Sequence, residues 1–187
     1  VVVTFVADEP ATRTAVDTSS DEAPVFSWSD SETFAVLEQT DALAVGANVA
    51  FEKIDGKANI TATFAKNDGK ESYQYVTIYP AAGYVSAESI NAATLKLPAN
   101  QTMASESYDP NADLMVSKVV TATAQPTEAQ QVQFTRLAAV VKMTLKNFNL
   151  EAGDEVEKVV FMADGKALAG TITADLNATH DVTDAEG

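Results

Sequence analysis

Residues 132–148, VQFTRLAAVVKMTLKNF, form the longest stretch with a readable apolar pattern and neither glycine nor proline. Apolar and polar residues alternate along its second half, which is typical of a strand with one buried and one exposed face. A helix can also be drawn through the stretch, but we favour the strand, because valine and threonine lose side-chain freedom in a helix. The alternation slips between Phe134 and Leu137, so we expect a bend or a bulge near Arg136.

Strand-like patterns recur along the rest of the chain. They cover residues 1–7, 25–28, 33–38, 45–51, 58–65, 71–79, 114–123, 155–163 and 166–174. Asp-Gly pairs at 55–56, 68–69 and 164–165 separate several of these segments, and Asp-Gly is a favoured hairpin turn. Residues 58–65 and 71–79 should therefore be antiparallel neighbours, while residues 86–91 could form one helical turn. Many short strands joined by tight turns predict an all-β fold, an antiparallel β-sandwich or barrel.

The first strand, residues 1–7, is apolar on both faces. Val1, Val3, Phe5 and Ala7 lie on one face, and Val2 and Val6 lie on the other. A strand with this pattern is expected to be covered on both sides. Residues 8–24 then change to proline, serine, threonine and acid, which predicts an exposed loop. Arg13 lies in this loop, where a protease could reach it, whereas Arg136, the other arginine, lies in the expected sheet.

A chain of 187 residues is long enough for one substantial core. We expect residues 1–13 to form the first strand and the cleavage loop, and residues 14–176 to form the β-sandwich domain. Residues 177–187 are read as an acidic tail or the start of a second domain. No apolar run is long enough to span a bilayer, and we expect that any export signal has been removed or left out.

The chain is strongly acidic, with 27 acidic and 12 basic residues and a formal net charge of −15. This charge repels a phosphate backbone and argues against nucleic acid as a partner. Cysteine is absent from the sequence, so disulfide and thiolate chemistry are excluded.

Catalytic residue patterns are missing from the sequence. The only histidine, His180, stands in the acidic tail, so no nucleophile has an obvious base beside it. Residues 109–113, DPNAD, imitate the start of a calcium-binding loop. However, Leu114 stands where such a loop needs glycine, and Val120 stands where it needs glutamate. We interpret residues 109–113 as a polar connection, and the sequence predicts no enzyme, no metal site and no cofactor.

Aromatic side chains offer one candidate binding surface. Trp28, Tyr73, Tyr75, Tyr79 and Tyr84 could form a platform for a sugar, because the apolar faces of sugars favour aromatic rings. Tyr73, Tyr75 and Tyr79 share one face of a strand, however, so packing explains them as well, and we favour that interpretation.

A series of motifs runs through the chain in a recognisable order. It begins with Arg13-Thr14 in an acidic loop and continues with Trp28, Asp30, Phe34-Ala35-Val36, Tyr79-Pro80, LPANQT at 97–102, YDPNADLMV at 108–116, and Val132-Gln133-Phe134 leading into LAAVV at 137–141. This series resembles the fimbrillin (Mfa-like, type V pilin) family of Bacteroides-type bacteria. The resemblance covers about residues 1–145.

The resemblance implies a transthyretin-like, Greek-key β-sandwich, the N-terminal domain of a pilin that is exported as a lipoprotein precursor to the outer membrane and cell surface. It also implies processing by an arginine-specific protease, and Arg13-Thr14 matches the cleavage site by context. The strand removed by that cleavage would include Val1, Val2, Val3, Phe5 and Val6. A strand from another subunit would then fill the groove.

Two functions follow from these observations. The first is a structural pilin or fimbria-associated protein, whose partners are other pilin subunits and the processing protease, with host proteins or glycans as further partners. The alternative is a surface glycan- or protein-binding adhesin module that does not polymerise. A pilin needs a removable first strand and a cleavable Arg13, whereas a binding module needs exposed aromatic rings. We favour the pilin.

Overall fold

The computed structural model describes residues 1–8, 15–17, 25–102, 108–139, 160, 162, 164–165 and 167–178. In these ranges the chain is all-β, as the sequence predicts, and its two helices are short 3-10 turns, η1 (Ala81–Gly83) and η2 (Pro110–Ala112). The strands are β1 (Val2–Ala7), β2 (Ala15–Asp17), β3 (Val25–Ser27), β4 (Ala35–Gln39), β5 (Leu43–Val45), β6 (Ala47–Ile54), β7 (Lys57–Thr63), β8 (Tyr73–Tyr79), β9 (Tyr84–Ser89), β10 (Ala92–Leu97), β11 (Met115–Ser117), β12 (Val120–Ala122), β13 (Gln130–Val132), β14 (Phe134–Arg136) and β15 (Gly170–Ala174).

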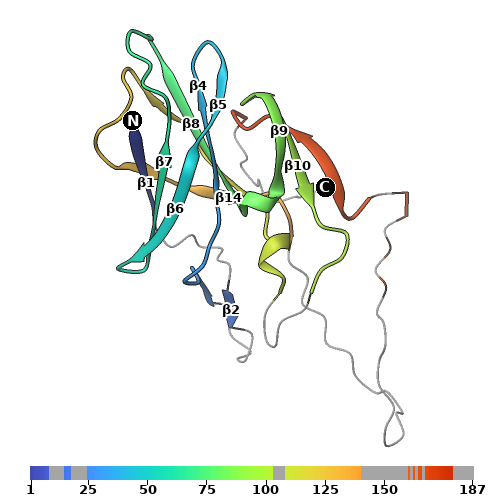
Figure 1. The fold of residues 1–187 in the computed structure, drawn as a ribbon. Helices are drawn as coiled ribbons and strands as arrows, with labels where there is room; N and C mark the ends of the chain where they lie inside the picture. Colours follow the sequence, from blue (N-terminus) through green and yellow to red (C-terminus); the bar gives the residue numbers. More distant parts are fainter. Residues whose placement is uncertain are drawn as a thin grey trace, which may run out of the picture.

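Three sheets form successive layers (Figure 1). The outer sheet has the strand order β13-β1-β7-β6, and the third sheet has the order β15-β10-β9. Between them lies the central sheet, β14-β11-β8-β4-β5, in which β12 also pairs with β8. Paired strands are antiparallel except β1 and β13, which are parallel. The short strands β2 and β3 pair only with each other within the described residues.

Side chains of the central sheet point alternately into two hydrophobic cores. Val36, Tyr75 and Tyr79 pack with residues of β1 and β7 in the outer sheet. Leu37 and Val76 point the other way and pack with residues of β10 in the third sheet. Strands β4 and β8 are therefore buried on both faces, which explains why their sequences are nearly continuous apolar runs.

The two Asp-Gly turns in the first half of the chain behave differently. Asp55 and Gly56 both have positive φ and join β6 to β7 in an antiparallel hairpin, as predicted. The turn at Gly69 instead carries the chain from β7 in the outer sheet to β8 in the central sheet, so the expected pairing of these strands is wrong. The apolar faces of β7 and β8 pack against each other across a core rather than side by side.

The long alternating stretch is divided at Gln133. Strand β13 pairs with β1 in the outer sheet, whereas β14 pairs with β11 in the central sheet. The chain changes sheets at Gln133, between the two strands, and it also bends at residues 137–138, directly after Arg136, where a bend or bulge was expected. Residues 137–139 are not in a strand, and residues 140–148 lie outside the described residues.

Further segments differ from the sequence-based prediction. Strand β2 lies within residues 8–24, which were expected to form a loop. Residues 86–91 do not form a helical turn, because most of them belong to β9, which pairs with β10. The predicted strand at 45–51 is broken at Gly46 into parts of β5 and β6, and that at 114–123 is divided into β11 and β12. Most of the predicted strand at 155–163 lies outside the described residues.

Gly46 is the point at which the chain passes from the central sheet to the outer sheet. Its amide donates a hydrogen bond to the carbonyl oxygen of Val36 at 2.8 Å. A Cβ atom on Gly46 would lie 2.9 Å from Ala62 Cβ and 3.1 Å from a ring carbon of Phe64. Replacement by alanine therefore forces two packed strands apart.

We expect Gly46→Ala to lower the free energy of unfolding by about 1–3 kcal/mol, the usual cost of overpacking a core. Urea denaturation of both proteins measures this difference. Ala47→Ser, on the exposed neighbouring residue, is the matched control and should change stability by less than about 0.5 kcal/mol. A Gly46→Ala protein as stable as the control would contradict the predicted clash.

Candidate functional site: the slot occupied by β1

Strand β1 lies inside the outer sheet, with a partner on each side. On one side it is antiparallel to β7, from Val2 opposite Thr63 to Ala7 opposite Ala58. On the other side it is parallel to β13, with Phe5 opposite Gln130. Removing β1 would open a gap in the middle of the sheet and leave two strand edges without hydrogen-bond partners. We call this position between β7 and β13 the β1 slot.

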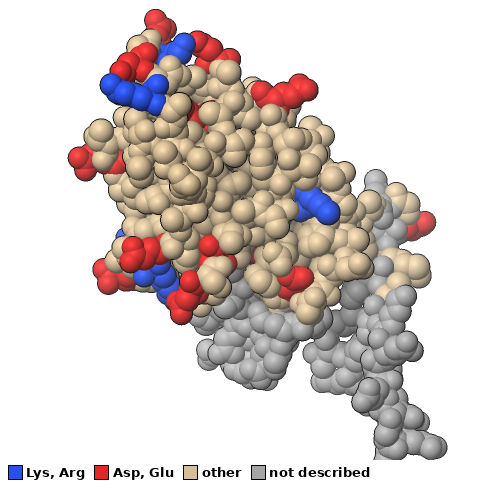
Figure 2. Space-filling model, viewed as in Figure 1, with Lys and Arg blue, Asp and Glu red and all other residues tan. Residues whose placement is uncertain are grey.

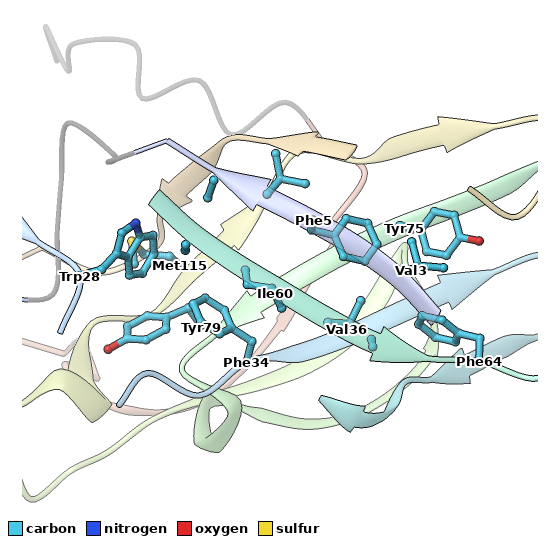
Figure 3. Close-up of a cluster of buried hydrophobic side chains, with 14 of the residues drawn as sticks. Val3, Phe5, Trp28, Phe34, Val36, Ile60, Phe64, Tyr75, Tyr79 and Met115 are labelled. Atoms are coloured by element: carbon cyan, nitrogen blue, oxygen red, sulfur yellow. The ribbon is translucent and has the colours of Figure 1, made fainter. Parts of the chain in front are cut away.

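The inward side chains of β1 fill the first core. Val3 and Phe5 are fully buried and Ala7 is 1% exposed. The ring of Phe5 lies beside Tyr75, with 5.6 Å between the ring centroids (Figure 3). Burial of a valine or phenylalanine side chain contributes about 1.5–3 kcal/mol each. The β1 slot therefore has a defined set of apolar positions, for a valine, an aromatic ring and a small residue in turn.

The outward side of β1 is not covered, contrary to the expectation from its sequence. Val2 is 60% exposed, and Val6 is only partly buried. The outer sheet is a surface layer of the described structure, so its strands have one core face and one solvent face. The apolar residues on both faces of β1 led to the expectation that both faces are buried. Whether the outward face is buried depends on whether another layer packs on the sheet, and the sequence of β1 does not show this.

Charged residues mark the end of the slot. Asp8 follows β1 directly and forms an ion pair with Lys57 of β7, with an Oδ1 to Nζ distance of 2.6 Å. The hydrogen bond and the charge of Asp8 raise the pKa of the Lys57 ammonium group. Both side chains are well exposed, so this pair contributes little to stability. Arg13 and Thr14, the predicted cleavage site, lie outside the described residues.

Four of the five aromatic residues considered as a sugar platform are buried, and Tyr84 is partly buried. Trp28, Tyr73, Tyr75 and Tyr79 are at most 2% exposed. Trp28 packs edge-on against Tyr79, with ring centroids 5.7 Å apart, and lies in the same core as Phe5 (Figure 3). Their faces are covered by other side chains, so these rings act as core residues, which is the interpretation that we favoured.

Two of the tyrosine hydroxyls donate hydrogen bonds to buried carboxylates. Tyr75 donates to Glu38 Oε2 at 2.7 Å, and Tyr79 donates to Glu32 Oε2 at 2.6 Å. Gln125 also donates to Glu38 Oε2, at 3.1 Å. These hydrogen bonds satisfy polar groups that would otherwise be costly inside an apolar core. Glu38 belongs to β4, so the bond from Tyr75 links two strands of the central sheet.

The pKa of Tyr75 is raised above its ordinary value by burial and by the hydrogen bond to Glu38. The neutral hydroxyl is therefore favoured in the folded state, and its contribution to stability is complete below pH 10 and declines as the pH rises further. At pH 11 we expect Tyr75 to account for a loss of about 1.4 kcal/mol, because one pKa unit corresponds to 1.36 kcal/mol. Urea denaturation of wild type and Tyr75→Phe at pH 8 and pH 11 measures this loss of stability. The variant should lose less stability between the two pH values, and equal losses would contradict the prediction.

A buried ion pair was not foreseen from the sequence. Arg136 of β14 donates two hydrogen bonds to the carboxylate of Asp113, one of them from Nη2 at 2.8 Å. Tyr108 donates to Asp113 Oδ2 at 2.8 Å and accepts from Arg136 Nη2 at 3.1 Å. The Arg136 side chain is 11% exposed, and that of Asp113 is fully buried. Burial alone would lower the pKa of Arg136, but the hydrogen bond and charge of Asp113 raise it.

In the segment that imitates a calcium loop, the two carboxylates accept hydrogen bonds from protein groups. Asp109 accepts hydrogen bonds from the backbone amides of Thr102 and Asn111, which hold its pKa below the ordinary value. Asp113 faces Arg136 instead. The two carboxylates therefore do not converge on one point, and no cluster of three or more potential metal ligands occurs among the residues that the structure describes.

In the described part of the chain, no helix is long and apolar enough to cross a membrane. Comparison with protein-family models, with curated proteins and with solved structures finds no match to this chain.

Proposed function

We propose that the chain is a structural subunit of a bacterial surface fimbria, or a fimbria-associated protein, that assembles by strand exchange. Cleavage after Arg13 would separate β1 from the rest of the chain, and a strand from another subunit would take its place. One observation carries this proposal. The strand that precedes Arg13 in the sequence is an interior strand of a sheet, paired on both sides and filling a core.

The chemistry of an empty slot favours such an exchange. Loss of β1 leaves hydrogen-bonding groups of β7 and β13 without partners, and each buried group without a partner costs about 1–3 kcal/mol. It also exposes the apolar side chains that surround Phe5, including Tyr75 and Ile60. An incoming strand restores both the backbone hydrogen bonds and the apolar burial, which is the physical basis of recognition by strand addition.

The arginine content supports a single processing event. The chain has two arginines, and Arg136 is held by Asp113 and Tyr108 within a strand of the central sheet. A protease binds its substrate as an extended, accessible backbone, so Arg136 is a poor site in the folded protein. An arginine-specific protease is thereby directed to Arg13.

The proposal has consequences for partners and location. Other pilin subunits and the processing protease would be the principal partners, and the chain would be exported as a lipoprotein precursor to the outer membrane and the cell surface. A transthyretin-like Greek-key arrangement is the more specific fold that this function implies. The alternative, a glycan-binding module based on exposed aromatic rings, has less support because Trp28, Tyr73, Tyr75 and Tyr79 are buried.

Limited digestion of the folded chain with an arginine-specific protease tests the proposal. We expect one cut, after Arg13, followed by loss of the first strand and a shift to oligomers on size-exclusion chromatography. Arg13→Lys retains the positive charge and should remain an uncut monomer. If the wild-type chain is cut but keeps its first strand and stays monomeric, the proposed function is wrong.

A further inference from the structure

One wall of the β1 slot is a strand that pairs with little else. In the outer sheet β13 is an edge strand, and within the described residues its one strand partner is β1. The opposite wall, β7, is also paired with β6, from Lys57 to Thr63. Loss of β1 therefore leaves β7 in a hairpin, whereas β13 keeps no backbone ladder among the described strands. The position of β13 in an empty slot must depend on contacts at its two ends.

The end of β13 is fixed to the central sheet. The amide of Lys118 donates a hydrogen bond to the carbonyl oxygen of Gln133 at 2.8 Å. The residues that follow Gln133 form β14, which pairs with β11. Neither contact involves β1, so this end of β13 should stay in place when β1 is lost.

The segment that leads into β13 is held by the side chain of Gln125. Its Nε2 donates to the carbonyl oxygen of Ala65 at 2.9 Å, and its Oε1 accepts from the amide of Asn67 at 3.1 Å. Ala65 follows Phe64, whose backbone forms two hydrogen bonds with Val1. Gln125 therefore joins the approach to β13 directly to the chain at the end of β7, beside the Val1 end of the slot.

A third hydrogen bond fixes the same side chain to the core. Gln125 Nε2 also donates to Glu38 Oε2 at 3.1 Å, and the hydroxyl of Tyr75 donates to the same oxygen at 2.7 Å. Glu38 is 4% exposed, so little water competes for these bonds. The ring of Tyr75 lies beside Phe5. Gln125 thus connects the approach to β13, through Glu38, to the ring that an incoming strand would contact at the Phe5 position.

Charge has little influence on the entry of a strand at this face. The outward positions of β1 and of the facing part of β7 are uncharged: Val2, Thr4, Val6, Asn59, Thr61 and Thr63. In Figure 2 most charged side chains of the described residues lie toward the two ends of the molecule, and the broad area between them is largely uncharged. Steering by charge is therefore weak here, and the rate of entry should depend on the state of the slot.

We infer that Gln125 is a positioning residue for strand exchange, which keeps β13 in place while the slot is empty. An incoming strand then meets two walls that are already ordered, instead of having to order β13 as it binds. A slot that is ordered only part of the time binds more weakly by that fraction, because only the ordered form is competent. This inference rests on the proposed function, because the slot must first lose β1.

The association rate of a donor peptide tests the inference. The chain is cleaved after Arg13, freed of its first strand and diluted to a concentration at which copies rarely meet. A fluorescent peptide of residues 1–13 is then added, and its anisotropy is followed over time. Gln125→Met retains a long side chain but loses the three hydrogen bonds, and should bind the peptide about tenfold more slowly than wild type. The dissociation rate should change less than about twofold, because the bound peptide itself holds β13.

Two further variants complete the comparison. Gln125→Asn keeps the amide on a side chain that is one methylene shorter and cannot reach all three partners, so it should also slow association, and it serves as the test if Gln125→Met does not fold. Gln101→Ala is the matched control. Gln101 is exposed and donates to the carbonyl oxygen of Pro98, after β10 in the third sheet, so its loss should leave both rates unchanged.

The two rates separate the possible failures. Equal association rates for wild type and the Gln125 variants would show that the empty slot does not need this anchor, and the inference would be wrong. Faster dissociation with unchanged association would mean that Gln125 only stabilises the filled slot, which also overturns the inference. If the wild-type chain itself does not bind the peptide, the slot does not open, and the proposed function is wrong as well.

Discussion

Phe5→Ala should lower the free energy of unfolding by about 3–5 kcal/mol, the usual cost of replacing a buried phenylalanine by alanine. Phe5 is fully buried at the centre of β1, and its ring contacts that of Tyr75. The backbone around it is fixed by β7 on one side and β13 on the other, so the cavity left by the ring cannot collapse easily. Urea denaturation of the uncleaved chain measures the change.

Val2→Ala is the matched control for this prediction. Val2 belongs to the same strand but is 60% exposed, so its truncation should change stability by less than about 0.5 kcal/mol. A similar loss in both variants would mean that the two faces of β1 contribute equally, contrary to the structure. Phe5→Leu retains most of the apolar volume, so its loss of stability should lie between those of Phe5→Ala and Val2→Ala.

Alternation in the sequence was sufficient to locate many of the strands. It placed β1 and β8 close to their observed bounds, and it predicted the all-β class. It could do so because a period of two is the direct consequence of side chains pointing to opposite faces of a strand. The Asp55-Gly56 turn was also predictable, since both residues adopt positive φ there. These features depend on neighbouring residues only, and the sequence contains all the information that they need.

The assignment of strands to layers was not predictable in the same way. Alternation says which residues share a face, but it does not say which sheet a strand joins. The chain changes sheets at Gly46, near Gly69 and at Gln133. The sequence marks a turn at Asp68-Gly69, but a turn does not say whether the strand that follows stays in the same sheet. The outward face of β1 was misjudged for the same reason, because exposure of Val2 depends on which layer is outermost.

The candidate site was partly predictable. The resemblance implied that the first strand is removable and that Arg13 is a cleavage site, and both stay predictions. The structure adds that β1 has two pairing partners and that its inward residues fill a core. The interaction of Arg136 with Asp113 escaped notice because the two residues are distant in sequence and meet only where β14 pairs with β11. Asp113 was assigned to a polar loop, although it is a buried charge.

Asp113→Asn should lower the free energy of unfolding by about 3–5 kcal/mol, because it leaves the guanidinium of Arg136 buried without its counter-charge. Arg136 is 11% exposed and Asp113 is fully buried, so water compensates little for the lost ion pair. Urea denaturation measures the loss. The double variant Asp113→Asn, Arg136→Met removes both charges and should be more stable than Asp113→Asn alone. A loss below about 1 kcal/mol in the single variant would contradict this account.

The same substitution also affects proteolysis, because the ion pair holds Arg136 against Asp113 and Tyr108. In Asp113→Asn the strand that contains Arg136 opens more often, and proteolysis of an opened state follows its population. An arginine-specific protease should therefore cut the variant at a second site, after Arg136, at least tenfold faster than it cuts wild type there. Arg136→Lys should show no second cut, because the recognised side chain is absent. Equal cutting of wild type and Asp113→Asn after Arg136 would mean that the ion pair does not restrict the protease to Arg13.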